Sequence, residues 1–154
     1  MKVPYHVVVS LAVSGLVWLW LSSAAAALAC FLAGVFVDLD HLVDYCLKYG
    51  ARIRPRHLFH VFETEVADNV FVFLHAWEWI PLALVIMWLV DDWPPVAIGL
   101  LIGFSVHLVF DQLVNRHHPW AYFITFRAAH RFSGPHFYGA HEYRRRLKGM
   151  KNKT

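Results

Sequence analysis

The side chains of this sequence that could do chemistry are histidines and carboxylic acids at the ends of long apolar segments. They occur in three groups, Asp38 to His41, His75 to Glu78 and His107 to Asp111. Imidazole nitrogen and carboxylate oxygen are both ligands of divalent metal ions. Ionisable residues in apolar segments are costly to bury and usually mark a functional site. We therefore predict a metal centre at one face of a membrane.

His107 and Asp111 are the clearest candidates, because an i, i+4 pair lies on one face of a helix, one turn apart. Both side chains could then reach the same ion or the same group of a substrate. The alternative is a structural hydrogen bond that joins neighbouring helices. We favour the ligand role, because polar side chains in an apolar helix are expensive to keep unpaired.

Asp38 and Asp40 close the first apolar segment together with His41. In an uninterrupted helix the two aspartates would point about 200° apart. Both can face one centre only if the helix ends here and the backbone turns. Otherwise one of them is a solvated carboxylate. We rank Asp40 and His41 above Asp38 as metal ligands.

His75 and Glu78 are three residues apart, and we expect them to share a helical face near the start of an apolar span. Glu78 could be the general base beside a metal ion, and Asp38 is the second candidate for that role. The candidates outnumber the four ligands that zinc normally takes. The sequence therefore predicts two metal ions, or one ion whose ligands are held by further residues.

Two further sets of residues are weaker candidates. His57, His60 and Glu63 are spaced by threes, which fits either a ligand face or the polar edge of an amphipathic helix on lipid. Arginine makes paired contacts with phosphate, so an arginine near a metal centre would bind an anionic group. Attraction to a lipid surface explains such arginines equally well. The arginines considered are Arg56, Arg116, Arg127 and Arg131.

Composition places the chain among integral membrane proteins. Of its 154 residues, 58% are hydrophobic and 16% are charged, and the apolar residues occur in blocks. We predict one all-α membrane domain over residues 1–154, with a basic cytoplasmic tail at 143–154. Lysine and arginine gather in this tail and in the loop 48–56, as they do at cytoplasmic, lipid-facing ends of spans. We expect membrane lipid as a partner and no nucleic acid.

Three apolar segments stand out, at 7–37, 70–90 and 96–114. The second and third are each long enough for one span, and Pro94-Pro95 separates them. The first is long for one span, so we expect a tight hairpin at Leu21-Ser22-Ser23. This predicts a polytopic protein of about four hydrophobic helices with interfacial helices beside them. With both termini cytoplasmic, all three groups of candidate residues lie near the cytoplasmic face.

The sequence also resembles a known family. The run from Gly103 to Leu113, followed by Pro119-Trp120 and Arg127, looks like the C-terminal signature of the bacterial YdjM-like inner-membrane metal-dependent hydrolases. In that family an early histidine leads to Pro-Asp-x-Asp-His, then His-Arg-x-x-Thr-His-Ser, then Ser-His-x-x-x-Asp. The chain departs from this pattern at Val37, where the family has proline, and it lacks the His-Arg-x-x-Thr-His-Ser box.

The resemblance covers residues 6–131 and implies a ligand set. The matching positions are His6, Asp38, Asp40, His41, His75, His107 and Asp111. It adds His6 to the metal ligands and implies the bacterial inner membrane as the location. It also implies a divalent cofactor, for which we expect zinc first and manganese or iron as alternatives, as one or two ions.

These observations predict a membrane-embedded hydrolase that acts on a phosphoester or another lipid-borne bond at the cytoplasmic face. In this interpretation a metal ion lowers the pKa of a water molecule, and Glu78 or Asp38 accepts the proton. The first alternative is a non-enzymatic membrane protein whose histidines bind metal or haem. The second is a structural subunit of a larger membrane complex, which would bind no metal.

Overall fold

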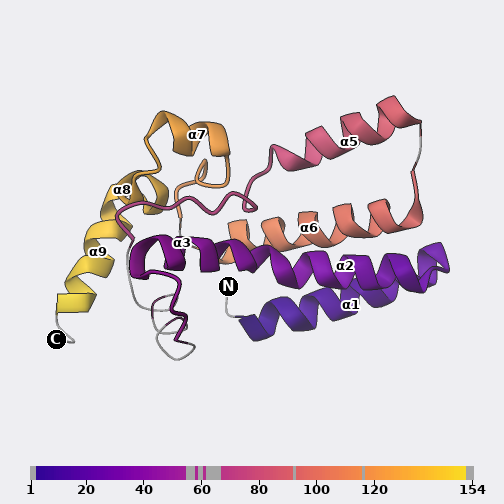
Figure 1. Ribbon diagram of the computed structural model, residues 1–154, viewed down its shortest axis with the longest axis horizontal. Coiled ribbons are helices and arrows are strands. Elements are labelled where there is room, and N and C mark those ends of the chain that lie inside the picture. Colours follow the sequence, from indigo (N-terminus) through magenta and orange to yellow (C-terminus); the bar gives the residue numbers. More distant parts are fainter. Residues whose placement is uncertain are drawn as a thin grey trace. The chain divides into compact units, whose positions relative to one another are not determined.

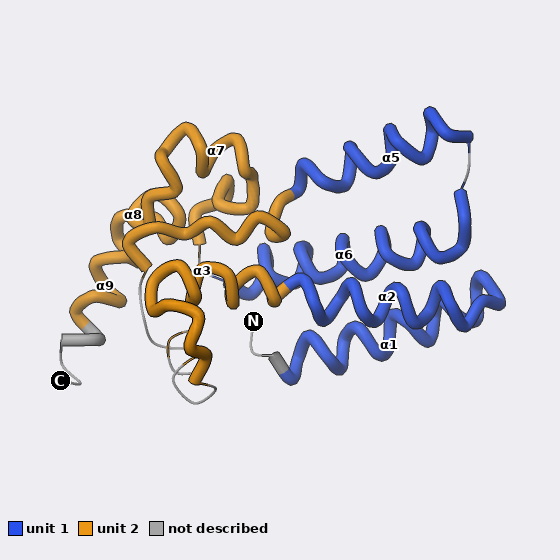
Figure 2. The backbone as a smooth tube through the Cα atoms, viewed as in Figure 1, with its two compact units in different colours: residues 1–37, 77–115 blue, residues 38–76, 116–154 orange. Residues whose placement is uncertain are grey.

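A computed structural model shows that the regular secondary structure of the described residues is helical. The described residues are 3–54, 58, 61, 67–91, 93–115 and 117–151. The chain forms two compact units, residues 1–37 with 77–115 and residues 38–76 with 116–154 (Figure 2). The expected all-α fold is confirmed.

The first unit holds the apolar helices (Figure 1). They are α1 (Val3–Leu21), α2 (Ala24–Phe36), α5 (Trp79–Val90) and α6 (Pro95–Val114). Three stretches are long and apolar enough to cross a membrane, namely Pro4–Leu21, Ala24–Tyr49 and Pro95–Val114, and α5 is a shorter apolar helix. The predicted set of about four hydrophobic helices is therefore confirmed.

The N-terminal hairpin forms where the sequence indicated. Ser22 ends α1 with a positive φ of 49° and donates its backbone N–H to the carbonyl of Trp18, a common way to close a helix. Ser23 then caps α2, because its hydroxyl accepts the backbone N–H of Ala26 at 3.2 Å. Two consecutive serines thus stop one helix and start the next.

Helices α2 and α6 pack through small residues and run in the same direction. A Cβ atom on Gly99 would collide with the carbonyl of Ala26, and one on Gly103 would collide with the carbonyl of Cys30. Glycine is therefore required at both positions for the backbones to approach this closely. Such small residues four apart are how apolar helices associate when hydrophobic burial offers little gain.

The prediction of a span over 70–90 is wrong in extent. The helix α5 begins only at Trp79, and its 12 residues cover about 18 Å at 1.5 Å per residue. A bilayer core is about 30 Å thick, so α5 by itself is too short to cross it. Residues 70–78 are not helical: they form an extended stretch with turns at 73–74 and 77–78. The third predicted span is confirmed, since α6 starts at Pro95, a favoured first helical residue.

The second unit consists of short helices around the extended segment 67–76. The helices are α3 (Asp40–Tyr49), α7 (Ile124–Ala129), α8 (Gly134–Tyr138) and α9 (Ala140–Lys151), and the 3-10 helix η1 (Val37–Leu39) leads into α3. The extended segment pairs with the turn after α7 through an isolated bridge between Asn69 and Ser133. A Cβ on Gly134 would collide with the carbonyl of Ala67, so the two backbones touch here.

Helix α9 contains most of the predicted basic tail. Glu142 lies on it between two arginine contacts, accepting from Arg145 at 2.7 Å and from Arg146 at 2.9 Å. These guanidinium groups lower the pKa of Glu142 to about 2. The carboxylate is therefore charged at any physiological pH, and it offsets part of the positive charge of the helix.

We predict that Gly103→Ala destabilises the first unit, because the added methyl group must push α6 away from α2. Overpacking of this kind costs about 1–3 kcal/mol. The matched control is Gly15→Ala on α1, where nothing lies within 4 Å of the new Cβ. Thermal unfolding of the detergent-purified protein, followed by circular dichroism, measures both. Equal midpoints for the two variants would contradict the close packing.

Candidate metal centres

The first unit brings together His6 from α1 with His107 and Asp111 from α6. We call these three residues the first cluster. His6 Nε2 lies 3.2 Å from Asp111 Oδ1, and His107 Nε2 lies 3.8 Å from Asp111 Oδ2. The two imidazole rings stack with centroids 4.2 Å apart. All three side chains are buried, and their ligand atoms lie within 4.8 Å of one another.

The packing of α2 against α6 also positions His107. Along the two helices Gly99 meets Ala26 and Gly103 meets Cys30, so the next turn places His107 beside Gly34. There His107 Nδ1 lies 2.9 Å from the Gly34 carbonyl oxygen, which can only accept a hydrogen bond. In a neutral imidazole this puts the proton on Nδ1 and leaves the lone pair of Nε2 toward Asp111. Metal-binding histidines are held in this way.

The second unit brings together Asp38 from η1, His41 from α3 and His75 from the extended segment. We call these residues the second cluster. Asp38 Oδ1 lies 3.3 Å from His75 Nε2 and 3.8 Å from His41 Nε2. The rings of His41 and His75 are 4.8 Å apart, and the ligand atoms again lie within 4.8 Å of one another.

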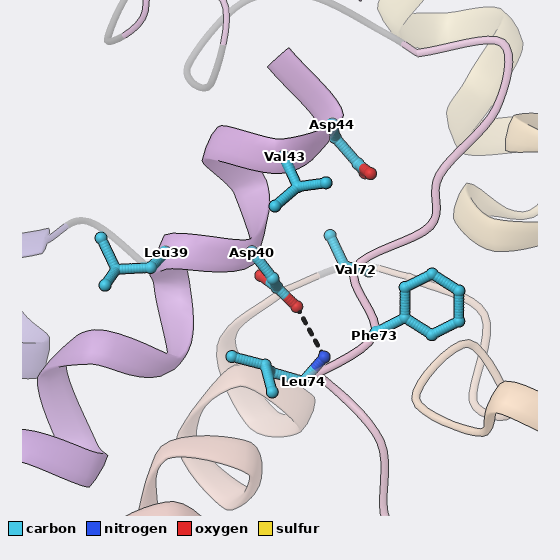
Figure 3. A pocket seen from close by; sticks show the side chains of 7 residues that line it. All are labelled: Leu39, Asp40, Val43, Asp44, Val72, Phe73 and Leu74. Atoms are coloured by element: carbon cyan, nitrogen blue, oxygen red, sulfur yellow. Dashed lines mark hydrogen bonds between the residues drawn. The ribbon is translucent and has the colours of Figure 1, made fainter. Parts of the chain in front are cut away.

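His75 has a carboxylate at each ring nitrogen. Its Nε2 faces Asp38, and its Nδ1 lies 3.0 Å from Asp40 Oδ2. Asp40 Oδ2 also accepts the backbone N–H of Leu74 at 2.8 Å (Figure 3) and that of His75 at 3.3 Å. Asp40 therefore fixes both the ring and the backbone of His75. With the Nδ1 proton directed at Asp40, the lone pair of Nε2 faces the second cluster.

The segment that carries His75 is held by a buried arginine. Arg127 donates to the carbonyls of Phe71 at 2.5 Å, of Val72 at 2.7 Å and of His75 at 3.0 Å. Val72 has a positive φ of 29°, which is strained for a β-branched residue and costs about 1–3 kcal/mol. The arginine contacts keep the backbone in this conformation, which turns His75 toward Asp38 and Asp40.

The break in the helix that the sequence required at the first aspartates is present. The α-helical path stops at Phe36, passes through η1 and resumes at Asp40. This lets Asp38 and Asp40 contact the same imidazole. Asp38 joins His41 and His75 as a ligand group, whereas Asp40 contacts the opposite nitrogen of His75. The ranking of Asp40 above Asp38 as a metal ligand stays a prediction.

The prediction that His75 and Glu78 share a helical face is wrong, because His75 lies in a bend that precedes α5. Glu78 is the residue before the first turn of α5 and is partly buried. Its role as a general base stays a prediction.

The predicted anion-binding arginines fall into three situations. Arg127 is 2% exposed, and the three contacts given above are to backbone carbonyls. Arg131 is exposed in the turn after α7, with a φ of 53°. Arg56 and Arg116 lie outside the described residues, as do His57, His60 and Glu63. Anion binding by these arginines stays a prediction.

Three structural residues of the sites, Gly99, Gly103 and Asp44, escaped the sequence reasoning. The pattern Gly99-x-x-x-Gly103-x-x-x-His107 was visible in the sequence and predicts a close helix contact that ends at the histidine. Asp44 gave no local signal, yet its Oδ2 accepts the backbone N–H of Phe71 at 3.1 Å, 27 residues away. Only the fold reveals that contact.

Fold and site together define an all-α protein with three candidate membrane spans and with buried histidine and aspartate groups that could hold metal ions. Comparison with known proteins adds no relative. No family model matches the chain, and no curated protein and no solved structure is significantly similar to it. The function must therefore be argued from the site itself.

We predict that Asp40→Asn loosens the segment around His75, because an amide cannot accept three N–H groups as a carboxylate does. Losing a charge-assisted hydrogen bond costs about 1–3 kcal/mol. Hydrogen exchange of a peptide covering residues 71–76 should become faster. Asp91→Asn is the control, because Asp91 ends α5 in a left-handed conformation that asparagine also tolerates. Unchanged exchange in Asp40→Asn would show that Asp40 does not hold the segment.

Proposed function

We propose that this protein is a membrane-embedded metal-dependent hydrolase in which each cluster holds one divalent ion. The main observation behind the proposal is that the imidazole ring of one histidine in each cluster is held in a fixed orientation. In each cluster one histidine has its Nδ1 against a fixed acceptor, Gly34 O for His107 and Asp40 for His75. The lone pair of Nε2 then faces a carboxylate and a second histidine.

The donor sets suit a catalytic ion better than a purely structural one. Each cluster offers two imidazoles and one carboxylate, His6, His107 and Asp111 in the first and His41, His75 and Asp38 in the second. Three protein ligands leave a coordination position for water or substrate, as in hydrolytic zinc sites. The same set also binds iron, so zinc is the first choice and iron or manganese the alternatives.

The residues of the chain would have different roles in the proposed reaction. A bound ion supplies Lewis acidity and lowers the pKa of a nearby water. The histidines hold the ion, while Asp40 and the Gly34 carbonyl keep their rings oriented. Glu78, beside the start of α5, is the proposed proton acceptor, and Asp38 is the alternative. The exposed guanidinium of Arg131 would attract an anionic substrate.

The proposed substrate is a phosphoester or another bond carried by a lipid. Three candidate spans support a membrane location and lipid contact. The proposed topology has both termini on the cytoplasmic side of a bacterial inner membrane, and its support is the basic helix α9, because positive charge favours that side.

Metal analysis tests the clusters. Elemental analysis of the detergent-purified protein should find two equivalents of a divalent metal per chain, because each cluster has its own ligand set. We expect His107→Ala to lose one equivalent, His75→Ala to lose one and the double variant to lose both. His141→Ala is the control, because His141 is an exposed residue of α9.

The possible results separate the three classes of function. Absence of metal from every sample would overturn the proposal and favour a structural subunit. A visible haem spectrum would favour a haem protein, although the nearly parallel stacking of His6 on His107 suits two ligands of one haem poorly. Metal that survives both substitutions would mean that other residues bind it.

Activity tests the catalytic role of Glu78. Glu78→Gln should lower the hydrolysis rate of a chromogenic phosphodiester by roughly 10²–10⁴, the usual contribution of a general base, while metal content stays unchanged. Glu142→Gln on α9 is the matched control and should keep full activity. A metal-loaded wild type without any hydrolysis would leave a non-enzymatic metal-binding protein. Full activity in Glu78→Gln would move the role of base to Asp38.

A further inference from the structure

A hollow lies in the second unit between α3 and the extended segment (Figure 3). Its volume is about 270 Å³, and it is open on one side. The surface that lines it is almost wholly apolar, and the apolar side chains come from Leu39, Val43, Val72, Phe73 and Leu74. Apolar hollows with few polar groups are typical of ligand sites.

The two carboxylates of the hollow are largely engaged by backbone. Asp40 accepts from Leu74 and contacts His75, and Asp44 Oδ2 accepts the N–H of Phe71. Asp44 Oδ1 is buried without a hydrogen-bond partner among the described residues. This oxygen is out of reach of a ligand, so the hollow offers an almost wholly hydrocarbon surface.

The hollow is placed to receive a ligand from the bilayer. Helix α3 is the end of the candidate span Ala24–Tyr49. At the hollow, Leu39 and Val43 are each 53% exposed and Phe73 is 50% exposed. Such apolar surface on a membrane segment contacts lipid chains without loss of hydrophobic burial.

The hollow also borders the second cluster through Asp40. Asp40 links the two, because it lines the hollow and holds the Nδ1 of His75, a residue of the second cluster. Leu39 follows Asp38 in the chain and Leu74 precedes His75, so two lining residues are direct neighbours of two cluster residues.

We propose that the hollow binds the acyl chain of a membrane lipid whose phosphoester head group lies at the second cluster. Placement of the head group rests on the proposed function, whereas binding of the acyl chain does not. A lipid with one acyl chain and a phosphate monoester, such as lysophosphatidic acid, fits both features.

Photo-labelling with lysophosphatidic acid that carries a diazirine in its acyl chain tests the proposal. The purified wild-type protein in detergent is irradiated with the probe, and labelled residues are identified by mass spectrometry. We expect labelling to concentrate on residues 39–43 and 72–74. In Val43→Trp the new ring fills the hollow and should lower labelling about tenfold, as the loss of contact with a few methylenes predicts. Leu47→Trp, one turn further on α3, is the control.

The outcomes separate the acyl site from the proposed hydrolase. His75→Ala should keep labelling at the hollow even if metal and activity are lost. Labelling at the hollow in a protein without hydrolase activity would support the acyl site and contradict only the enzymatic role. Labelling spread evenly over exposed residues such as Leu16 and Leu19 of α1 would overturn the proposal. The wild-type map decides this even if Val43→Trp fails to fold, and Val43→Phe provides a milder second variant.

Discussion

The close contact of α2 with α6 is the constraint on which the first unit depends. Glycine at 99 and 103 lets the two backbones touch, and this contact fixes the relative register of the helices. The same register brings the Gly34 carbonyl within 2.9 Å of His107 Nδ1. A bulkier residue in the contact would therefore displace a metal-ligand candidate as well as a helix. The contact between α2 and α6 therefore determines both the packing of the helices and the position of His107.

In the second unit, polar contacts rather than helix packing hold the candidate site in place. The extended segment lacks the internal hydrogen bonds of a helix, so its backbone groups need partners from elsewhere. Arg127 supplies three donors, and Asp40 and Asp44 accept N–H groups from the segment. Burial of these charged side chains is tolerated because their hydrogen-bonding groups meet the backbone of the segment. The strained backbone of Val72 persists for the same reason.

Local pattern was sufficient for part of the fold. The serines at 22 and 23 and the prolines at 94 and 95 mark real helix ends, because capping and the missing proline N–H act within one turn. The apolar residues from Val70 to Leu74 were misleading. Their hydropathy suits a span, but contacts with residues up to 56 positions away hold them in an extended form. No local rule could reveal those contacts.

In the candidate sites, too, some contacts follow from local sequence pattern and others depend on tertiary structure. The pairing of His107 with Asp111 follows from helix geometry, and its outcome was predictable. The roles of Asp38 and Asp40 were not, because they depend on which ring nitrogen of His75 each carboxylate faces. The side of the ring that each carboxylate faces is set by tertiary contacts between residues 35 or more positions apart in the sequence. Composition can name the residue types of such a site, but only tertiary contacts assign their places.

The acceptors behind the two fixed histidines give the clusters different chemical character. A backbone carbonyl holds Nδ1 of His107, and a carboxylate holds Nδ1 of His75. A carboxylate draws the Nδ1 proton more strongly and so makes Nε2 of the same ring a better electron donor. In the proposed hydrolase His75 would therefore be the stronger ligand of the two. A more strongly donating ligand would bind its ion more firmly and leave it a weaker Lewis acid, so the two clusters would take unequal shares of binding and catalysis.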